Sequence, residues 1–86
     1  MPTALRVSDR ELLWLNVYRA SELHGGLVLG RLALYVRDPQ LMLHLTRHAA
    51  EEVEHAQLWT ETILAVGGRP RPIRNTYQRV YAREVG

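Results

Sequence analysis

The side chains of this sequence best suited to chemistry are carboxylates and imidazoles that recur at helical spacing. Glu52 and His55 are three residues apart, so in a helix both lie on one face, with Cβ atoms about 5–6 Å apart. A carboxylate and an imidazole at this separation can bind the same metal ion, and a carboxylate can also bridge two hard cations. His48 lies one turn before Glu52. Its expected role is one of three: a further metal ligand, a hydrogen-bond partner of a ligand, or a polar core residue. The spacing therefore predicts a metal site.

Apolar residues on both sides of this pair indicate that its face is turned inward. In alternating steps of three and four, the stripe comprises Leu41, Leu45, His48, Glu52, His55, Trp59, Ile63 and Val66. An unpaired carboxylate buried in such a stripe would cost several kcal/mol or would become protonated. A bound metal ion removes that cost, so the composition of the stripe also favours metal binding.

A first helix is predicted over residues 8–37. Ser8 and Asp9 are good N-cap residues, and no proline interrupts the segment, in which apolar residues recur at helical spacing. Gly25 and Gly26 are its weak points, because glycine costs about 1 kcal/mol relative to alanine in a helix interior. These two glycines either permit the close approach of another backbone or make room at the metal.

A second helix is predicted over residues 39–66. Asp38 can cap it, and Pro39 suits its first position, where the missing N–H costs nothing. Gly67-Gly68 supplies the stop. Because the connection is short, the helices should be antiparallel neighbours. The predicted fold class is all-α, a single domain made of a two-helix hairpin and a tail over residues 67–86, extended at first and then forming a short helix.

Glu22 is the carboxylate of the first helix that can join the pair. It lies about 16 residues before the turn and the midpoint of Glu52 and His55 about 15 after it, so at about 1.5 Å per residue they are level within roughly 2 Å. One hairpin then supplies two carboxylates and one imidazole, too few for a di-metal centre. Two copies across a two-fold axis would supply each ligand twice and would bury their apolar faces in a four-helix bundle.

Composition limits the other classes of function. The chain has 86 residues, no cysteine, a net charge of +2 and 47% apolar residues. Disulfides and thiolate metal sites are excluded, and the small positive charge gives little reason to expect nucleic acid as a partner. No apolar run approaches the ~20 residues needed to span a bilayer, and the N-terminal residues lack a secretory pattern. We therefore expect a cytoplasmic protein that binds neither membrane nor nucleic acid.

The second helix also carries a motif of a known family. The run from Glu51 to Ala56, Glu-Glu-Val-Glu-His-Ala, matches the Glu-Glu-x-Glu-His-Ala run of ferritins, and Gly67-Gly68-x-Pro70 recurs after that helix in ferritin-like proteins. The chain most closely resembles the short encapsulated ferritins, which are likewise single hairpins. The likeness runs without a gap from Glu22 to Ala56.

This resemblance implies a di-iron protein whose ligands are Glu22, Glu52 and His55, each contributed twice. The pair of ions in each dimer would be iron, with manganese or zinc as alternatives, and the activity would be a ferroxidase that oxidises Fe(II) to Fe(III) in iron storage or detoxification. The partners implied are a second copy of the chain, a ring of such dimers and an encapsulin shell, which would place the protein inside a nanocompartment in the cytoplasm.

Two other functions stay open. The family's Trp-Tyr pair after the first-helix glutamate is Val28-Leu29 here, and acidic residues near its iron route are replaced by His24 and Leu34. An apolar Val28-Leu29 would favour a different di-metal enzyme, such as a peroxidase or a small-molecule oxidase. The third reading is a non-catalytic helical oligomerisation module whose polar stripe fixes the register of the dimer.

Other side chains of the helices have simpler expectations. His24 and His44 are expected at the surface, with an auxiliary metal contact as the alternative. Glu51 and Glu54 are expected to face outward or to contact a neighbouring dimer. Both tryptophans are expected to be packing anchors, whereas Tyr18, one turn before the first-helix glutamate, could act beside the metal.

Overall fold

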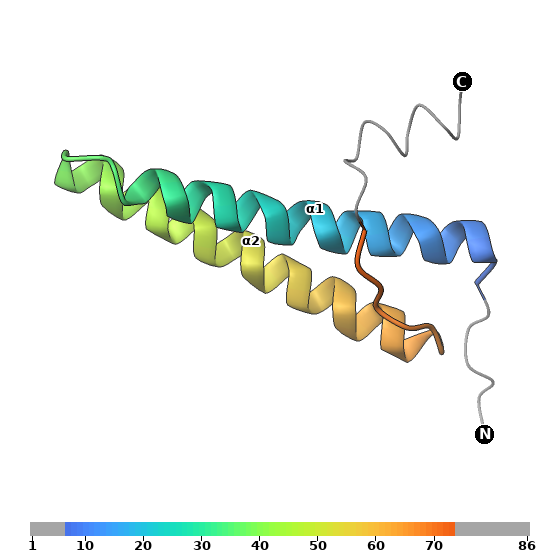
Figure 1. Cartoon of the computed structure of the whole chain (residues 1–86). Coiled ribbons are helices and arrows are strands. Elements are labelled where there is room, and N and C mark those ends of the chain that lie inside the picture. The colour runs from blue at the N-terminus through green and yellow to red at the C-terminus, as the bar shows by residue number, and fades with distance from the viewer. Residues whose placement is uncertain (1–6, 74–86) are drawn as a thin grey trace.

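The computed structural model describes residues 7–73, and this part of the chain is an antiparallel helical hairpin (Figure 1). Helix α1 spans Asp9–Ala33 and helix α2 spans Pro39–Ala65, with no strand between residues 7 and 73. The predicted all-α hairpin is confirmed, while the short helix expected in the tail lies outside the described residues. Neither helix has an apolar stretch long enough to cross a membrane.

Both helices begin where the sequence predicts. The Ser8 hydroxyl accepts a hydrogen bond from the Glu11 N–H at 3.1 Å, and the Glu11 carboxylate accepts one from the Ser8 N–H at 2.9 Å. This reciprocal capping box satisfies two free amides and lowers the pKa of Glu11. At α2 the Asp38 carboxylate accepts from the Leu41 N–H at 3.1 Å, and Pro39 takes the first helical position.

Helix α1 ends at Ala33, earlier than the predicted residue 37. The chain leaves it through a tight turn in which the Tyr35 N–H donates to the Leu32 carbonyl at 3.0 Å. The reason lies in the next cap: Asp38 has an extended backbone, and a residue before proline avoids the helical region. Helix α2 ends at Ala65, and Gly67 with a φ of 80° provides the left-handed stop.

Small residues bring the two helices together. Gly26 is buried, and a Cβ atom placed there would lie 2.8 Å from Val53 Cγ2 and 3.1 Å from the Ala49 carbonyl oxygen. Gly26 therefore permits the close backbone approach that the sequence offered as one of two explanations. Nearer the open end of the hairpin, Arg19 Nε donates to Thr60 Oγ1 across the seam at 2.7 Å.

One helix–helix seam is too narrow to bury the predicted stripe of α2. Within residues 7–73, Val17 and Ile63 are the large side chains that are fully buried. His48 and His55 are exposed in this single hairpin, as is Leu41, so the expectation that they face inward stays a prediction for a paired hairpin. Their face is the one that a second hairpin would have to cover.

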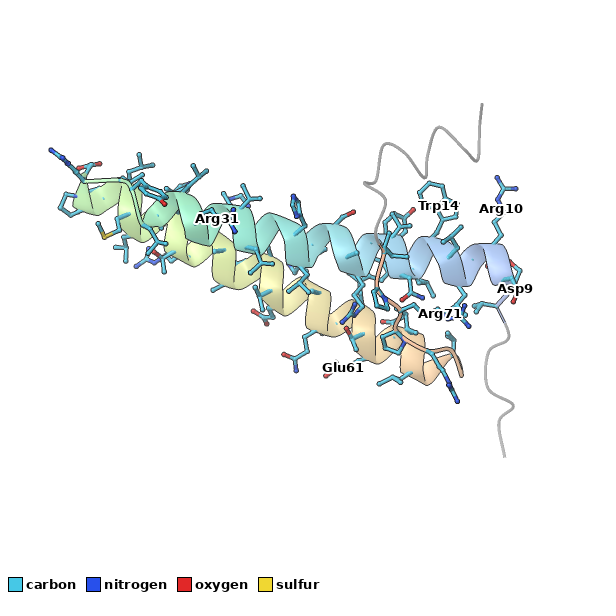
Figure 2. All side chains as sticks on the ribbon, viewed as in Figure 1. Asp9, Arg10, Trp14, Arg31, Glu61 and Arg71 are labelled. Carbon is cyan, nitrogen blue, oxygen red and sulfur yellow. The ribbon has the colours of Figure 1, made fainter. Side chains whose placement is uncertain are left out.

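Residues 69–73, which follow α2, turn back across α1 as a strap (Figure 1). Asn16, only 2% exposed, fixes this strap: its Nδ2 donates to the Arg69 carbonyl at 3.3 Å, and its Oδ1 accepts from the Arg71 N–H at 2.6 Å. The same Nδ2 also donates to the Leu12 carbonyl at 3.2 Å. Figure 2 shows Arg71 beside the N-terminal half of α1. One side chain therefore bonds to two backbone groups of the strap, the Arg69 carbonyl and the Arg71 N–H.

Replacing Asn16 with alanine is expected to lower the free energy of unfolding by about 1–3 kcal/mol, since two part-buried hydrogen bonds to the backbone of the strap are lost. Hydrogen exchange of the Arg71 amide should become much faster in the variant. Thr62→Ala is a suitable control, because the Thr62 hydroxyl donates only to the Leu58 carbonyl of its own helix. Equal protection of the Arg71 amide in N16A and wild type would contradict this role of Asn16.

Candidate metal centre

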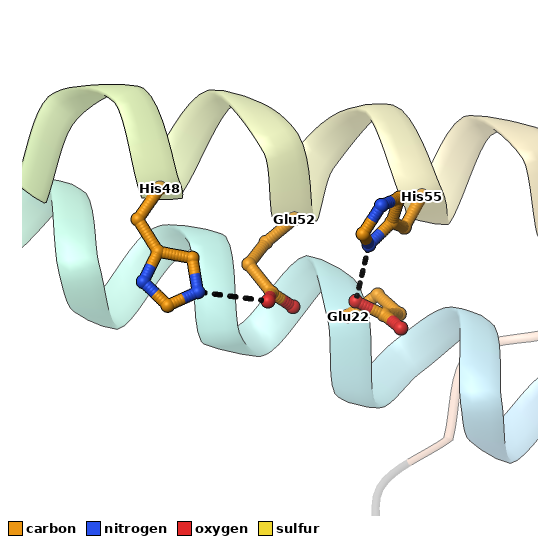
Figure 3. A network of polar contacts seen from close by, with 4 residues as sticks. All are labelled: Glu22, His48, Glu52 and His55. Carbon is orange, nitrogen blue, oxygen red and sulfur yellow. Dashed lines mark hydrogen bonds and ion pairs between the residues drawn. The ribbon is translucent and has the colours of Figure 1, made fainter.

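The three predicted ligands come together on one face of the hairpin. Glu22 projects from α1, and Glu52 and His55 project from adjacent turns of α2 (Figure 3). One ligand atom from each of these residues can be chosen so that all three lie within 4.8 Å of one another. The register predicted from the distance of each residue to the turn is therefore correct.

The contacts in this Glu22–Glu52–His55 cluster pair carboxylates with imidazoles. His55 Nδ1 lies 3.3 Å from Glu22 Oε2, and His48 Nε2 lies 3.3 Å from Glu52 Oε1 (Figure 3). The carboxylates are half-buried, with side-chain exposures of 28% for Glu22 and 24% for Glu52, whereas the histidines are about half exposed. The cluster thus lies partly sunk in the seam, with its imidazoles on the open side.

Gly25 makes room for this arrangement. A Cβ atom at Gly25 would lie 3.3 Å from Glu52 Oε2, a tight contact with the end of that side chain. The absence of a side chain lets the Glu52 carboxylate lie across α1 toward Glu22. The two explanations offered for the adjacent glycines therefore both apply, one to each: Gly26 allows helix approach and Gly25 leaves space at the cluster.

The two carboxylates shift each other's pKa in opposite directions. A hydrogen bond with Glu52 raises the pKa of Glu22, burial and the Glu52 charge act in the same direction, and His55 opposes them. The same bond lowers the pKa of Glu52, against the effect of burial and with help from His48 and His55. Two carboxylates this close cannot both ionise without cost, so Glu22 binds a proton more readily than an isolated glutamate does, and a bound cation would remove that cost.

Metal affinity is therefore expected to rise with pH through the raised pKa of Glu22. The sign follows because the ion competes with protons for the Glu22 carboxylate, and protons compete less as the pH rises. Calorimetric titration with Mn²⁺ in buffers of different ionisation enthalpy would measure the protons released. Binding with no proton release at pH values just above the usual range of a glutamate would contradict the raised pKa of Glu22.

The donor set fits a transition metal ion better than magnesium or calcium. Carboxylate oxygens alone would suit the hard cations, but an imidazole nitrogen among them favours iron, manganese or zinc. Metal–ligand distances near 2.0–2.2 Å require donors roughly 3–4 Å apart, so small side-chain rotations would close the observed spacing. Three protein donors leave positions free on any such ion, for water or for ligands from a second chain.

Aromatic side chains border the cluster on the side away from the hairpin turn. Tyr18, one turn before Glu22, packs against Trp59, one turn after His55, with ring centroids 5.2 Å apart. Trp14 continues the stack, with its ring centroid 5.9 Å from that of Tyr18. Both tryptophans make the packing contacts expected of them.

The structure also places the remaining candidate residues. Glu51 and Glu54 are exposed, as predicted, and so are His24 and His44. Sequence reasoning missed Asn16, although an asparagine in the middle of a helix, where it is a poor helix former, is a signal of a polar contact beyond that helix.

Comparison of the chain with protein-family models, with curated proteins and with solved structures gave no match. The class of protein is therefore defined by the fold of the hairpin and by the side chains on its open face. It is an all-α hairpin whose open face carries two carboxylates and one imidazole from both helices within ligand distance of one another.

Proposed function

We propose that two copies of this hairpin pair through their open faces to form a ferritin-like four-helix bundle with a di-iron ferroxidase centre. Each copy contributes Glu22, Glu52 and His55. The observation that carries this proposal is the convergence of these three side chains from two helices on a face that no other part of the described chain covers. The resemblance of residues 51–56 to the ferritin run supports the choice of iron.

Exposed apolar surface supports the pairing. Large apolar side chains at both ends of the cluster face are substantially exposed, among them Tyr18 at 38% and Leu41 at 44%. A chain of this size buries a smaller share of its surface than a larger domain, so association is a common way to complete the core. A four-helix bundle formed from two hairpins would cover both the cluster and this surface.

The residues of the cluster would act as a binding and proton-transfer site for Fe(II). Glu22, whose pKa is raised, would give up any proton that it holds as the cations arrive, and the two negative charges then favour the more highly charged Fe(III) product. His55, beside Glu22, supplies the nitrogen donor. Two Fe(II) ions lose one electron each, and the two electrons with two protons reduce one dioxygen to hydrogen peroxide, or one peroxide to water.

Larger assembly is part of the proposal. A bundle of two hairpins encloses no cavity in which oxidised iron could be stored. By its resemblance to the short encapsulated ferritins, the dimer would join others in a ring, and an encapsulin shell would hold the product. This location is proposed on the resemblance alone.

The deciding experiment combines native mass spectrometry with anaerobic Fe(II) titration and subsequent exposure to air. A dimer that binds two Fe(II) and then shows a ferric absorption rise would support the proposal. A monomer that binds no metal would overturn it. A dimer without metal would favour a helical oligomerisation module, and a dimer that turns over an organic substrate with peroxide would favour another di-metal enzyme.

A further inference from the structure

Two histidines that the proposed centre does not use lie together on α2. His44 and His48 are four residues apart, both are exposed, and their rings lie edge to face with centroids 6.4 Å apart. Side chains four residues apart on a helix occupy the same face. The His44–His48 pair thus presents two imidazoles next to each other, between the cluster and the hairpin turn.

The geometry of the pair suits a single transition metal ion. With metal–nitrogen distances of about 2.0–2.1 Å, the ring centres of two imidazoles on one ion lie roughly 4.5–5.5 Å apart. The observed 6.4 Å exceeds this by an amount that a small rotation of an exposed side chain removes. Imidazole nitrogens prefer nickel, copper, zinc and iron to magnesium and calcium, so the pair is selective by donor type.

His48 also connects this pair to the proposed centre. Its Nε2 lies 3.3 Å from Oε1 of Glu52, a separation that two donors of one ion commonly have. An ion bound by His44 and His48 would therefore lie next to the Glu52 carboxylate, which His48 contacts. Figure 3 shows His48, Glu52 and His55 in a row along α2, with Glu22 facing them from α1.

We propose that His44 and His48 form a second cation site, which binds divalent transition metal ions and passes them through Glu52 to the cluster. Binding at the His44–His48 pair needs only these two imidazoles. Delivery to the cluster rests on the proposed function. The two parts can be tested separately with one set of variants.

Binding is tested by titrating the full chain with Ni²⁺, which is not oxidised by air. His44→Ala is expected to weaken binding at this site by about tenfold or more. His24→Ala, at another exposed histidine, and Glu22→Gln, in the cluster, should leave that affinity unchanged. Ni²⁺ bound by the native conformation also raises the melting temperature of the native protein, and the increase should be smaller in His44→Ala than in wild type. Equal Ni²⁺ affinity in His44→Ala and wild type, or loss of this binding in Glu22→Gln, would overturn the site.

Delivery is tested by the rate of Fe(II) oxidation. His44→Ala should slow the initial rate several-fold at low Fe(II) and match wild type at saturating Fe(II), while His24→Ala behaves as wild type at both. If Ni²⁺ binding is lost but the rate at low Fe(II) is unchanged, delivery is refuted and the binding site stands. If wild type oxidises no iron, the proposed function fails, and the Ni²⁺ titration still decides the binding site. His44→Gln provides the same test should His44→Ala fold poorly.

Discussion

Replacing Glu52 with glutamine is expected to reduce the rate of Fe(II) oxidation by about a hundredfold or more, given that even residues supporting metal ligands are commonly worth 10–100-fold. Glu52 contacts His48 and is the main cause of the raised pKa of Glu22, so it interacts with both His48 and Glu22. Glutamine keeps the shape of the side chain but cannot provide the anionic oxygen that a cation requires. The rise of ferric absorption after addition of Fe(II) in air measures the loss.

The adjacent residue supplies the control for this variant. Glu51→Gln makes the same chemical change at an exposed position outside the cluster, and it should oxidise iron at nearly the wild-type rate. Metal-free Glu52→Gln should be about as stable as metal-free wild type, because the glutamine amide can still donate a hydrogen bond to Glu22 and Glu52 is partly exposed to solvent. Equal rates in the Glu51→Gln and Glu52→Gln variants would refute the assignment of the site, and a less stable Glu52→Gln would point to a structural role instead.

The main elements of the hairpin could be predicted because their signals are local. A capping residue followed by Pro39 marks the start of α2 whatever the rest of the chain does, and the capping box at Ser8 marks the start of α1. The juxtaposition of Glu22 with Glu52 was equally predictable. Once the turn is located, the constant rise of a helix fixes which residues are level.

Other features depend on contacts that no local pattern reveals. Asn16 bonds to Arg69 and Arg71, more than fifty residues away along the chain, so its partner could not be identified from spacing. The surroundings of His48 are of the same kind, because an apolar stripe predicts that a face is covered but not which molecule covers it. In a single hairpin that face is open, and the proposed dimer is the arrangement in which the original expectation would hold.

Replacing Gly26 with alanine is expected to lower the free energy of unfolding by up to about 2 kcal/mol, which is a typical overpacking cost of about 1–3 kcal/mol less the gain in helix propensity. The new Cβ would lie 2.8 Å from Val53 Cγ2 and 3.1 Å from the Ala49 carbonyl oxygen. Valine is stiff at χ1 in a helix, and the carbonyl belongs to the backbone of α2, so the two helices would have to separate. This cost outweighs the gain of about 1 kcal/mol from replacing glycine within a helix.

Gly25→Ala, one position earlier, should have the opposite effect on stability and a separate effect on the site. Its new Cβ meets only the flexible end of Glu52, so the variant keeps most of the helix-propensity gain but displaces the carboxylate by a few tenths of an ångström. It should therefore unfold at higher urea than wild type at the same protein concentration, yet bind Mn²⁺ several-fold more weakly. Gly26→Ala should unfold at lower urea.

A Gly25→Ala protein that binds Mn²⁺ as tightly as wild type would show that Glu52 does not lie across α1, whereas a fully stable Gly26→Ala protein would show that the helices do not meet at Gly26. Because the two substitutions are identical and adjacent, their opposite outcomes would separate the packing of the hairpin from the chemistry on its open face.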